Sequence, residues 1–216
     1  MTLLGRSEKV LFVKIFLSVL VIIFSLQSWI KADDVKDFEI EGISVSDSLL
    51  NFFNKEKISE FINHKSSYNY SNSDYTIIGI SKSNQNSLNL STYEHLGITI
   101  NKKDIQYKVK SIAGQSYSFA NIIECNTKQK IIAKDIKKEL IGNSINEDIW
   151  ENDQWISGGV VVGKSIMHDF VFNDESAVRI ICYELNEEGK KFANWEVKLD
   201  VIINSKEFNK FLKNIE

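Results

Sequence analysis

The segment from Ala193 to Ile203 constrains the fold most strongly, because apolar and charged residues alternate along it. The apolar and charged positions are Trp195, Val197, Leu199 and Val201 on one side and Glu196, Lys198 and Asp200 on the other. A period of two is typical of a strand in an antiparallel sheet with one buried face and one face in water. We therefore expect an antiparallel strand whose charged side chains face solvent.

Further strands are expected in groups joined by short polar turns, at 38–40, 75–81, 93–100, 105–112, 166–172 and 177–185. Helical spacing of apolar residues predicts an N-terminal helix pair, one long central helix at 119–141 and a short C-terminal helix that begins after Ser205. The first helix of the pair is expected to start at Ser44 or Ser46. Because the strands are linked as hairpins, the fold class is α+β, an antiparallel sheet with helices packed on it.

Residues 1–32 have the three-part layout of a secretory signal peptide. Basic residues precede an apolar run at 15–26, and Ala32 occupies the −1 position of a cleavage site. We expect cleavage after Ala32 and export of residues 33–216 as a single α+β domain to the bacterial periplasm. The alternative is an uncleaved signal anchor, with residues 15–30 in the inner membrane and no other membrane contact.

The charge balance argues against nucleic acid as a partner. Without residues 1–32, 22 basic and 28 acidic side chains remain, a net charge of about −6. The whole chain has 2 Arg, and Arg is the residue best suited to bidentate recognition of phosphate or guanine. The sequence therefore predicts no nucleic-acid binding.

Cys125 and Cys182 are the only cysteines of the chain, and both belong to the part expected to be exported. An even number of cysteines in an oxidising compartment favours a disulfide. Cys125 falls on the apolar stripe of the long helix, and Cys182 falls in a strand that such a helix would cover. We expect the two to be bonded. The alternatives are two buried free thiols or a redox pair, although no Cys-x-x-Cys motif supports the latter.

Four short segments carry a resemblance to a known group. They are Ala32-Asp33-Asp34, the string FEIEGISVSDSLLNFF at 38–53, Glu124-Cys125, and Arg179-Ile180-Ile181-Cys182-Tyr183. Together they resemble small, uncharacterised secreted proteins of Pelagibacter-type marine alphaproteobacteria, in which Gly stands at the position of Ser46. The resemblance implies export and no particular activity. A fainter likeness to small envelope-assembly and inhibitor-like α+β modules of bacteria concerns architecture, which does not determine function.

The common signatures of catalysis and metal binding are missing from the sequence. The three histidines, His64, His95 and His168, are 31 and 73 residues apart and show no local ligand spacing. No Gly-x-Ser-x-Gly nucleophile motif occurs. We therefore expect no catalytic, cofactor-binding or metal-binding residues, and the sequence favours a protein that is not an enzyme.

Trp150 and Trp155 are the candidate ligand-binding residues, in an expected loop with four polar residues between them. Two such rings can stack on a sugar, an aromatic group or a peptide. Alternatively, both rings fix the loop to the sheet. The favoured function is a non-enzymatic periplasmic domain that binds an envelope component or a small ligand. The alternatives are a periplasmic hydrolase with a site assembled from distant residues and a membrane-tethered domain.

Overall fold

The computed structural model describes residues 34–65, 67–82, 88–140, 145–157 and 159–215, and its largest feature is an antiparallel sheet of eight strands. The strands follow the order β3-β4-β5-β6-β10-β9-β8-β7 across the sheet. Their bounds are β3 Tyr68–Asn69, β4 Tyr75–Ser81, β5 His95–Asn101, β6 Val109–Ser116, β7 Asn146–Ser157, β8 Val160–Val171, β9 Ala177–Leu185 and β10 Val197–Asn204. A separate pair consists of β1 Glu39–Ile40 and β2 Ile43–Ser44.

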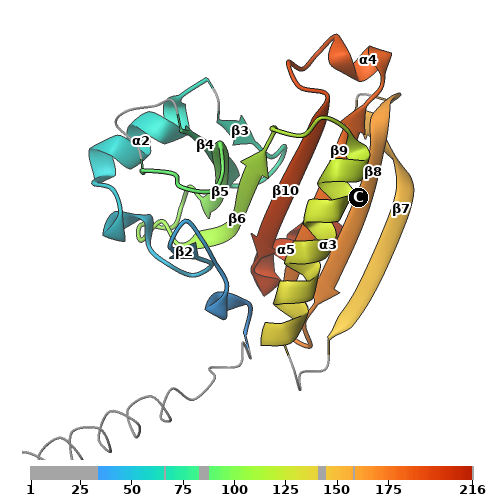
Figure 1. Ribbon diagram of the computed structural model, residues 1–216. Helices are drawn as coiled ribbons and strands as arrows, with labels where there is room; N and C mark the ends of the chain where they lie inside the picture. Colours follow the sequence, from blue (N-terminus) through green and yellow to red (C-terminus); the bar gives the residue numbers. More distant parts are fainter. Residues whose placement is uncertain (1–33, 66, 83–87, 141–144, 158, 216) are drawn as a thin grey trace, which may run out of the picture. The chain divides into compact units, whose positions relative to one another are not determined.

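The helices are α2 Lys55–Asn63, α3 Ile122–Glu139, α4 Glu187–Lys190 and α5 Lys206–Lys213, with short 3-10 helices η1 Val35–Asp37 and η2 Leu49–Asn51. Figure 1 shows the long helix α3 lying along β10, β9 and β8. Asn121 caps this helix, because its side-chain oxygen accepts hydrogen bonds from the backbone of Ile123 and Glu124, each at 3.0 Å. The predicted α+β fold, an antiparallel sheet with helices packed on it, is confirmed.

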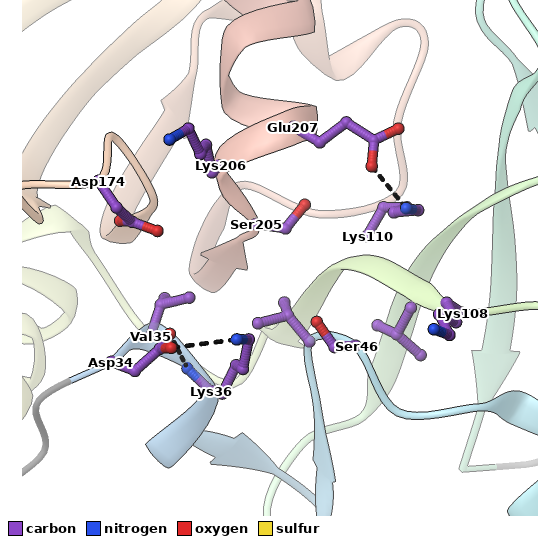
Figure 2. A pocket seen from close by; sticks show the side chains of 12 residues that line it. Asp34, Val35, Lys36, Ser46, Lys108, Lys110, Asp174, Ser205, Lys206 and Glu207 are labelled. Carbon is purple, nitrogen blue, oxygen red and sulfur yellow. Dashed lines mark hydrogen bonds and ion pairs between the residues drawn. The ribbon is translucent and has the colours of Figure 1, made fainter.

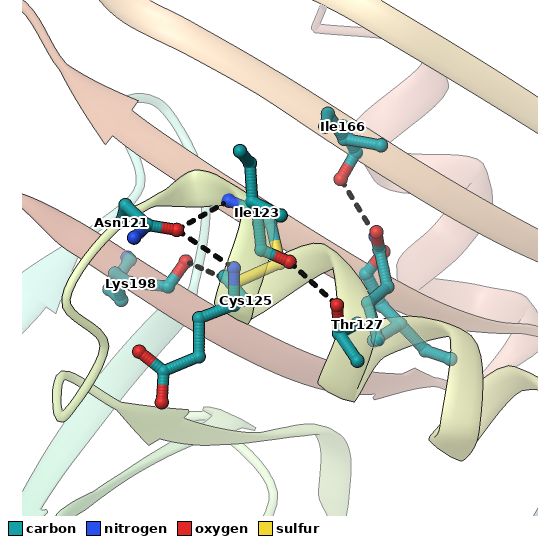
Figure 3. Close-up of a disulfide and its surroundings, with 10 residues drawn as sticks. Asn121, Ile123, Cys125, Thr127, Ile166 and Lys198 are labelled. Atoms are coloured by element: carbon teal, nitrogen blue, oxygen red, sulfur yellow. Dashed lines mark hydrogen bonds between the residues drawn. A yellow bond between two sulfur atoms is a disulfide. The ribbon is translucent and has the colours of Figure 1, made fainter.

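A disulfide and a buried amide attach α3 to the sheet. The disulfide joins Cys125 at the start of α3 to Cys182 in β9, and their Cα atoms are 6.0 Å apart (Figure 3). One turn further along, the fully buried Gln129 donates from Nε2 to the carbonyl oxygens of Ile166 (2.8 Å) and Ile180 (2.6 Å). The helix is thus bound to both β8 and β9. The face of the sheet under α3 is called the helix face below, and the opposite side is called the open face.

The main hydrophobic core lies on the helix face. Ile98 and Ile112 in the first half of the sheet and Ile180, Leu199 and Ile203 in the second are all at most 2% exposed. Ile58 and Phe61 of α2 extend this core over β4. Each such side chain contributes about 1.5–3 kcal/mol through its burial. The core therefore covers the helix face of the sheet with closely packed apolar side chains.

The predicted N-terminal helix pair is wrong in its first member. The helix expected from Ser44 or Ser46 to Phe53 is absent, and the short η2 takes its place. Backbone hydrogen bonds to the segment before β6 occupy this stretch: Ser46 N to Val109 O (2.8 Å), Val109 N to Asp47 O (2.8 Å) and Leu49 N to Tyr107 O (3.1 Å). Because these groups pair with another segment, they cannot form a helical ladder. The second member is present as α2.

The segment with Trp150 and Trp155 is a strand, and the predicted loop is wrong. β7 pairs with β8 along its length, with a shift in register between Trp150 and Asp153. Such a bulge breaks the alternation of side chains, and the polar residues between the two rings hide the pattern further. Both tryptophans therefore lie on an edge strand of the large sheet.

The expected signal peptide or anchor, residues 1–32, lies outside the described residues, and so does its cleavage site. Residues 34–215 belong to one compact unit. Within the described ranges, every helix is too short or too polar to cross a bilayer. Export, cleavage and the boundary at residue 33 stay predictions.

Candidate functional site

The register of the strands defines which side chains point to the open face. Cys182 faces α3, and its neighbour Ile181 therefore points the opposite way. Residues directly opposite each other on antiparallel strands share a face. One cross-strand row on the open face, called the Asp200 row, runs Trp150, Met167, Ile181, Asp200, Gln115. The adjacent row, called the Arg179 row, runs Asp169, Arg179, Ile202, Ala113, Gly97.

A cavity of about 530 Å³ lies over these two rows. The side chains of Phe208 and Leu212 from α5 line one end of it. The cavity is deeper over the Arg179 row, because Gly97 has no side chain and Ala113 has only a methyl group. The volume is within the range of small-molecule sites, and apolar side chains with a few convergent polar groups are the usual lining of such sites.

Asp200 is the most unusual residue of the cavity wall, with 5% of its surface exposed. Two donors reach its Oδ2 atom, Lys198 Nζ at 2.8 Å and Gln115 Nε2 at 3.5 Å. Its other oxygen, Oδ1, is buried and has no hydrogen-bond partner. Burial raises the pKa of Asp200, and the ion pair with Lys198 and the Gln115 bond act against this rise. A buried carboxylate oxygen without a donor is costly and rare in proteins.

Aromatic groups hold the partners of Asp200 in place. Lys198 Nζ lies 4.7 Å from the ring centre of Tyr183 and 5.2 Å from that of Trp195, so two cation–π contacts fix the ammonium group. The Tyr117 hydroxyl donates to Gln115 Oε1 at 3.0 Å, which orients the amide so that its nitrogen faces Asp200. Burial raises the pKa of Tyr117 to about 12, so its hydroxyl is protonated at neutral pH.

Arg179 and Asp169 form the second charged group of the cavity. Arg179 Nε donates to both carboxylate oxygens of Asp169, each at 3.2 Å. Its two terminal NH₂ groups donate to no other group within the described residues, and the side chain lines the cavity. Burial raises the pKa of Asp169, and the charge of Arg179 lowers it again in part. The guanidinium therefore keeps four N–H donors for a ligand.

The sequence predicted that the charged residues of β10 face water, and for Lys198 and Asp200 this is wrong. The side chain of Lys198 is 12% exposed, and Asp200 is more buried still. Asp200 lines the cavity, and Lys198 is paired with it rather than placed on a solvated face. The sequence patterns did not single out Arg179, Asp169, Gln115 or Tyr183 as site residues either. Charged residues inside neighbouring apolar strands were a signal that could have identified Arg179 and Asp169.

The two candidate tryptophans, Trp150 and Trp155, both point to the open face but have different surroundings. Trp150 lines the cavity and is 53% exposed. Trp155 stacks on Trp195, with ring centres 5.8 Å apart and planes at 16°, and contacts the Tyr183 ring at 5.1 Å. It also borders a second cavity of about 500 Å³, lined by apolar side chains that include the largely exposed Phe192. Trp150 is thus available to a ligand in the first cavity, whereas Trp155 is part of an aromatic cluster.

A third cavity, of about 280 Å³, lies between η1 and the start of α5 (Figure 2). Its charged side chains include two ion pairs, Lys36 with Asp34 at 3.1 Å and Lys110 with Glu207 at 2.5 Å. Among the described residues, none of the buried side-chain atoms without a hydrogen-bond partner belongs to a residue of this cavity, so the site offers less to a ligand than the open face does. Across the described ranges, no three His, Cys, Asp or Glu side chains gather as metal ligands.

The chain matches no protein family, no curated protein and no solved structure. The open face itself is therefore the main evidence for function. Asp200 has an unpaired buried oxygen and lines a cavity that also contains the incompletely paired guanidinium of Arg179.

Proposed function

We propose that this protein is an exported, non-enzymatic binding domain that holds a small polar ligand in the open-face cavity. The observation that carries the proposal is Asp200 Oδ1, which is buried, lacks a partner and belongs to a residue that lines the cavity. Leaving such an atom without a hydrogen bond costs about 1–3 kcal/mol. A ligand that donates to Oδ1 recovers this energy, which makes the site selective for a molecule with an N–H or O–H group.

Binding is favoured over hydrolysis by the chemistry of the lining. The described lining residues include no histidine that could act as a general base. The Ser111 hydroxyl donates to Asn204 Oδ1 at 2.6 Å and is fully buried with it, so it is not activated as a nucleophile. His168 belongs to the helix face, where Glu147 Oε1 lies 3.7 Å from its Nδ1 atom.

The disulfide supports the proposed location. Disulfides persist in the bacterial periplasm and are rare in the cytosol. Together with the signal-like residues 1–32, the Cys125–Cys182 bond favours a periplasmic protein. The ligand is then a molecule that reaches the periplasm, either from outside the cell or from the envelope.

A thermal-shift and calorimetric screen tests the proposal. The protein, purified with its disulfide intact, is tested against sugars, amines, carboxylic acids, amino acids and dipeptides. We expect at least one class to raise the melting temperature and to bind Asp200→Asn much more weakly. Asp135→Asn serves as the matched control, because Asp135 is an exposed residue of α3 paired with Lys138. Binding that is equal in wild type and Asp200→Asn would place the ligand elsewhere and overturn the proposal.

A further inference from the structure

We infer that the ligand of the open-face cavity is a zwitterion of the amino-acid or short-peptide class, with its ammonium group on Asp200 and its carboxylate on Arg179. This inference rests on the proposed function, because it identifies the chemistry of the same site. It follows from five properties of the cavity: an unpaired acceptor, a pair of NH₂ donor groups without a partner among the described residues, their spacing, the charges of the lining, and the apolar surface beside them.

The acceptor is Asp200 Oδ1. An ammonium group is the donor that best suits a carboxylate oxygen, because the hydrogen bond is charge-assisted. Lys198 and Gln115 already hold the other oxygen, Oδ2, so the orientation of the carboxylate is fixed before a ligand arrives. Of the two oxygens, Oδ1 is therefore the one left for the positive group of a ligand, and the ligand must displace the atoms that cover it.

The donor fork is the guanidinium of Arg179. Asp169 engages its Nε atom, and this contact positions the group without using its terminal nitrogens. Two terminal NH₂ groups in one plane match the two oxygens of a carboxylate. Because Asp169 neutralises much of the arginine charge, the site favours a ligand that makes directional hydrogen bonds over one attracted by charge alone.

The strand register sets the distance between the two groups. Asp200 lies opposite Ile181, and Arg179 is two residues from Ile181 on the same strand and the same face. Such diagonal neighbours have Cα atoms about 7–8 Å apart. A ligand between them needs a positive and a negative group on one small framework, which a free amino acid or a dipeptide provides.

Charges of both signs in the cavity support a ligand with one group of each sign. The charged lining residues are Asp169 and Asp200, which are acidic, and Arg179 and Lys213, which are basic. Lys198 adds a positive charge beside Asp200. A simple amine would leave the terminal nitrogens of Arg179 without an acceptor, and a simple carboxylic acid would leave Asp200 Oδ1 without a donor. A zwitterion satisfies both.

The rest of the Asp200 row indicates what side chain the ligand carries. Ile181 and Met167 continue the row away from Asp200, and Trp150 ends it at the rim. All three line the cavity. An apolar or aromatic side chain would lie over this strip, because it can bury its surface there without leaving a polar group unpaired.

Isothermal titration of the full chain tests the inference with matched probes. L-leucine, L-phenylalanine and L-leucyl-L-leucine are the zwitterions, 3-methylbutylamine and 4-methylpentanoic acid each lack one charged group, and glucose is the uncharged hydroxyl probe. We expect at least one zwitterion to bind, and each single-charge analogue to bind about tenfold more weakly or worse. Binding of glucose is not expected.

Two variants and one control test which residue binds the ammonium group of the ligand and which binds its carboxylate. Asp200→Asn should weaken the zwitterion and the amine and leave the acid unchanged, whereas Arg179→Lys should weaken the zwitterion and the acid. Arg179→Lys keeps a positive charge beside Asp169 but loses the fork, so it is less damaging to folding than removal of the charge. Asp135→Asn is the control and should bind like wild type. Circular dichroism of each variant shows whether it is folded.

The outcomes separate this inference from the proposed function. If glucose or a single-charge probe binds in an Asp200-dependent way and no zwitterion does, the zwitterion assignment is overturned and the binding function stands. If a zwitterion binds equally well to all three variants, its site is elsewhere and both proposals fail. If no probe of either panel binds, both are likewise overturned.

Discussion

At the scale of single residues, Ser46 is one of five non-glycine residues in the described ranges whose backbone has a positive φ. Its φ is +75°, in the left-handed region that favours glycine, and its backbone N–H is fixed by the bond to Val109. Backbone strain at a non-glycine residue there costs about 1–2 kcal/mol of stability. A glycine would remove this strain but would lose more conformational entropy on folding, which offsets part of the gain.

We therefore expect Ser46→Gly to stabilise the protein by about 0.5–1 kcal/mol, the balance of these two effects. Urea unfolding followed by circular dichroism measures the difference. Ser73→Gly is a suitable comparison among serines, because Ser73 does not have a positive φ. A loss of stability in Ser46→Gly would mean that backbone strain at this residue is negligible.

Asp200 gives a prediction about pH that needs no ligand. Burial raises its pKa in the folded protein above the value of about 3.9 expected in the unfolded chain, while the facing Lys198 and Gln115 lower it. The folded state thus holds its proton more tightly, and stability from this group is present at low pH and lost as pH rises through the raised pKa. The buried Tyr183 beside it stays neutral over this range, because its own pKa is raised by burial.

The measurable quantity is the free energy of unfolding of wild type minus that of Asp200→Asn. We expect this difference to be larger near pH 4.5 than near pH 7, because asparagine cannot take up the proton. Denaturant unfolding at a series of pH values, at constant ionic strength, provides it. A difference that stays flat, or grows toward neutral pH, would contradict a raised pKa for Asp200.

At the scale of elements, the disulfide is the covalent link between α3 and the sheet. It connects residues 57 positions apart and so closes a long loop in the unfolded chain. In the chain-entropy view, such a crosslink contributes up to about 4 kcal/mol. We expect the double variant Cys125→Ala, Cys182→Ala to lose stability of this order in urea unfolding. Reduction of wild type should reproduce the loss, and the double variant should be insensitive to the reductant.

The two tryptophans of β7 have different expected roles, Trp155 in stability and Trp150 in ligand binding. Trp155 stacks on Trp195 and contacts Tyr183, so Trp155→Ala should destabilise the fold by about 2–3 kcal/mol. Trp150 is half exposed at the cavity rim, and Trp150→Ala should change stability little while weakening the ligand. Thermal unfolding and calorimetry of the two variants, measured in parallel, check both statements. The reverse pattern would show that Trp155 contacts the ligand.

The elements themselves were predictable where local pattern and tertiary pairing agree. The strands expected at 75–81 and 177–185 have those bounds as β4 and β9, and Ser205 caps α5 as expected. The prediction of the first N-terminal helix was wrong, because its apolar spacing is helical but its backbone forms hydrogen bonds to the segment before β6. The strand β7 was not predicted, because a bulge and four polar residues interrupt the alternation of its side chains.

The candidate site was far less predictable than the fold. Asp169, Arg179 and Asp200 come from three strands and lie together through cross-strand register, which leaves no fixed spacing in the sequence. Of the residues identified beforehand, Trp150 reaches the cavity, and Cys125 and Cys182 are bonded beneath the other face of the sheet. Register between distant strands depends on the whole fold, so a pattern within one segment cannot supply it.

At the scale of the whole molecule, the pairing of β6 with β10 joins two halves of the sheet, β3 to β6 and β7 to β10. Six residue pairs and the buried hydrogen bond from Ser111 to Asn204 stabilise this joint. The tryptophans among the described residues, Trp150, Trp155 and Trp195, all belong to the second half or its loop. Their fluorescence therefore reports one half, whereas far-ultraviolet circular dichroism reports both.

If the joint couples the halves, the two signals should change at the same urea concentration in wild type. Asn204→Ala leaves the Ser111 hydroxyl buried without its acceptor, so it should lower the midpoint of both signals together. Exposed Asn63→Ala is the matched control, since Asn63 lies on α2 and bonds only a carbonyl of its own helix. Separate midpoints in wild type would show that the halves unfold independently.

The same joint determines when during synthesis the sheet can be finished. β6 ends at Ser116, but its partner β10 begins at Val197, so the first half of the sheet has an unsatisfied edge until nearly the whole chain has been made. A sheet of this topology can be completed only when almost the whole chain has emerged. If the protein is exported as proposed, the sheet stays incomplete until nearly all of the chain has crossed the membrane.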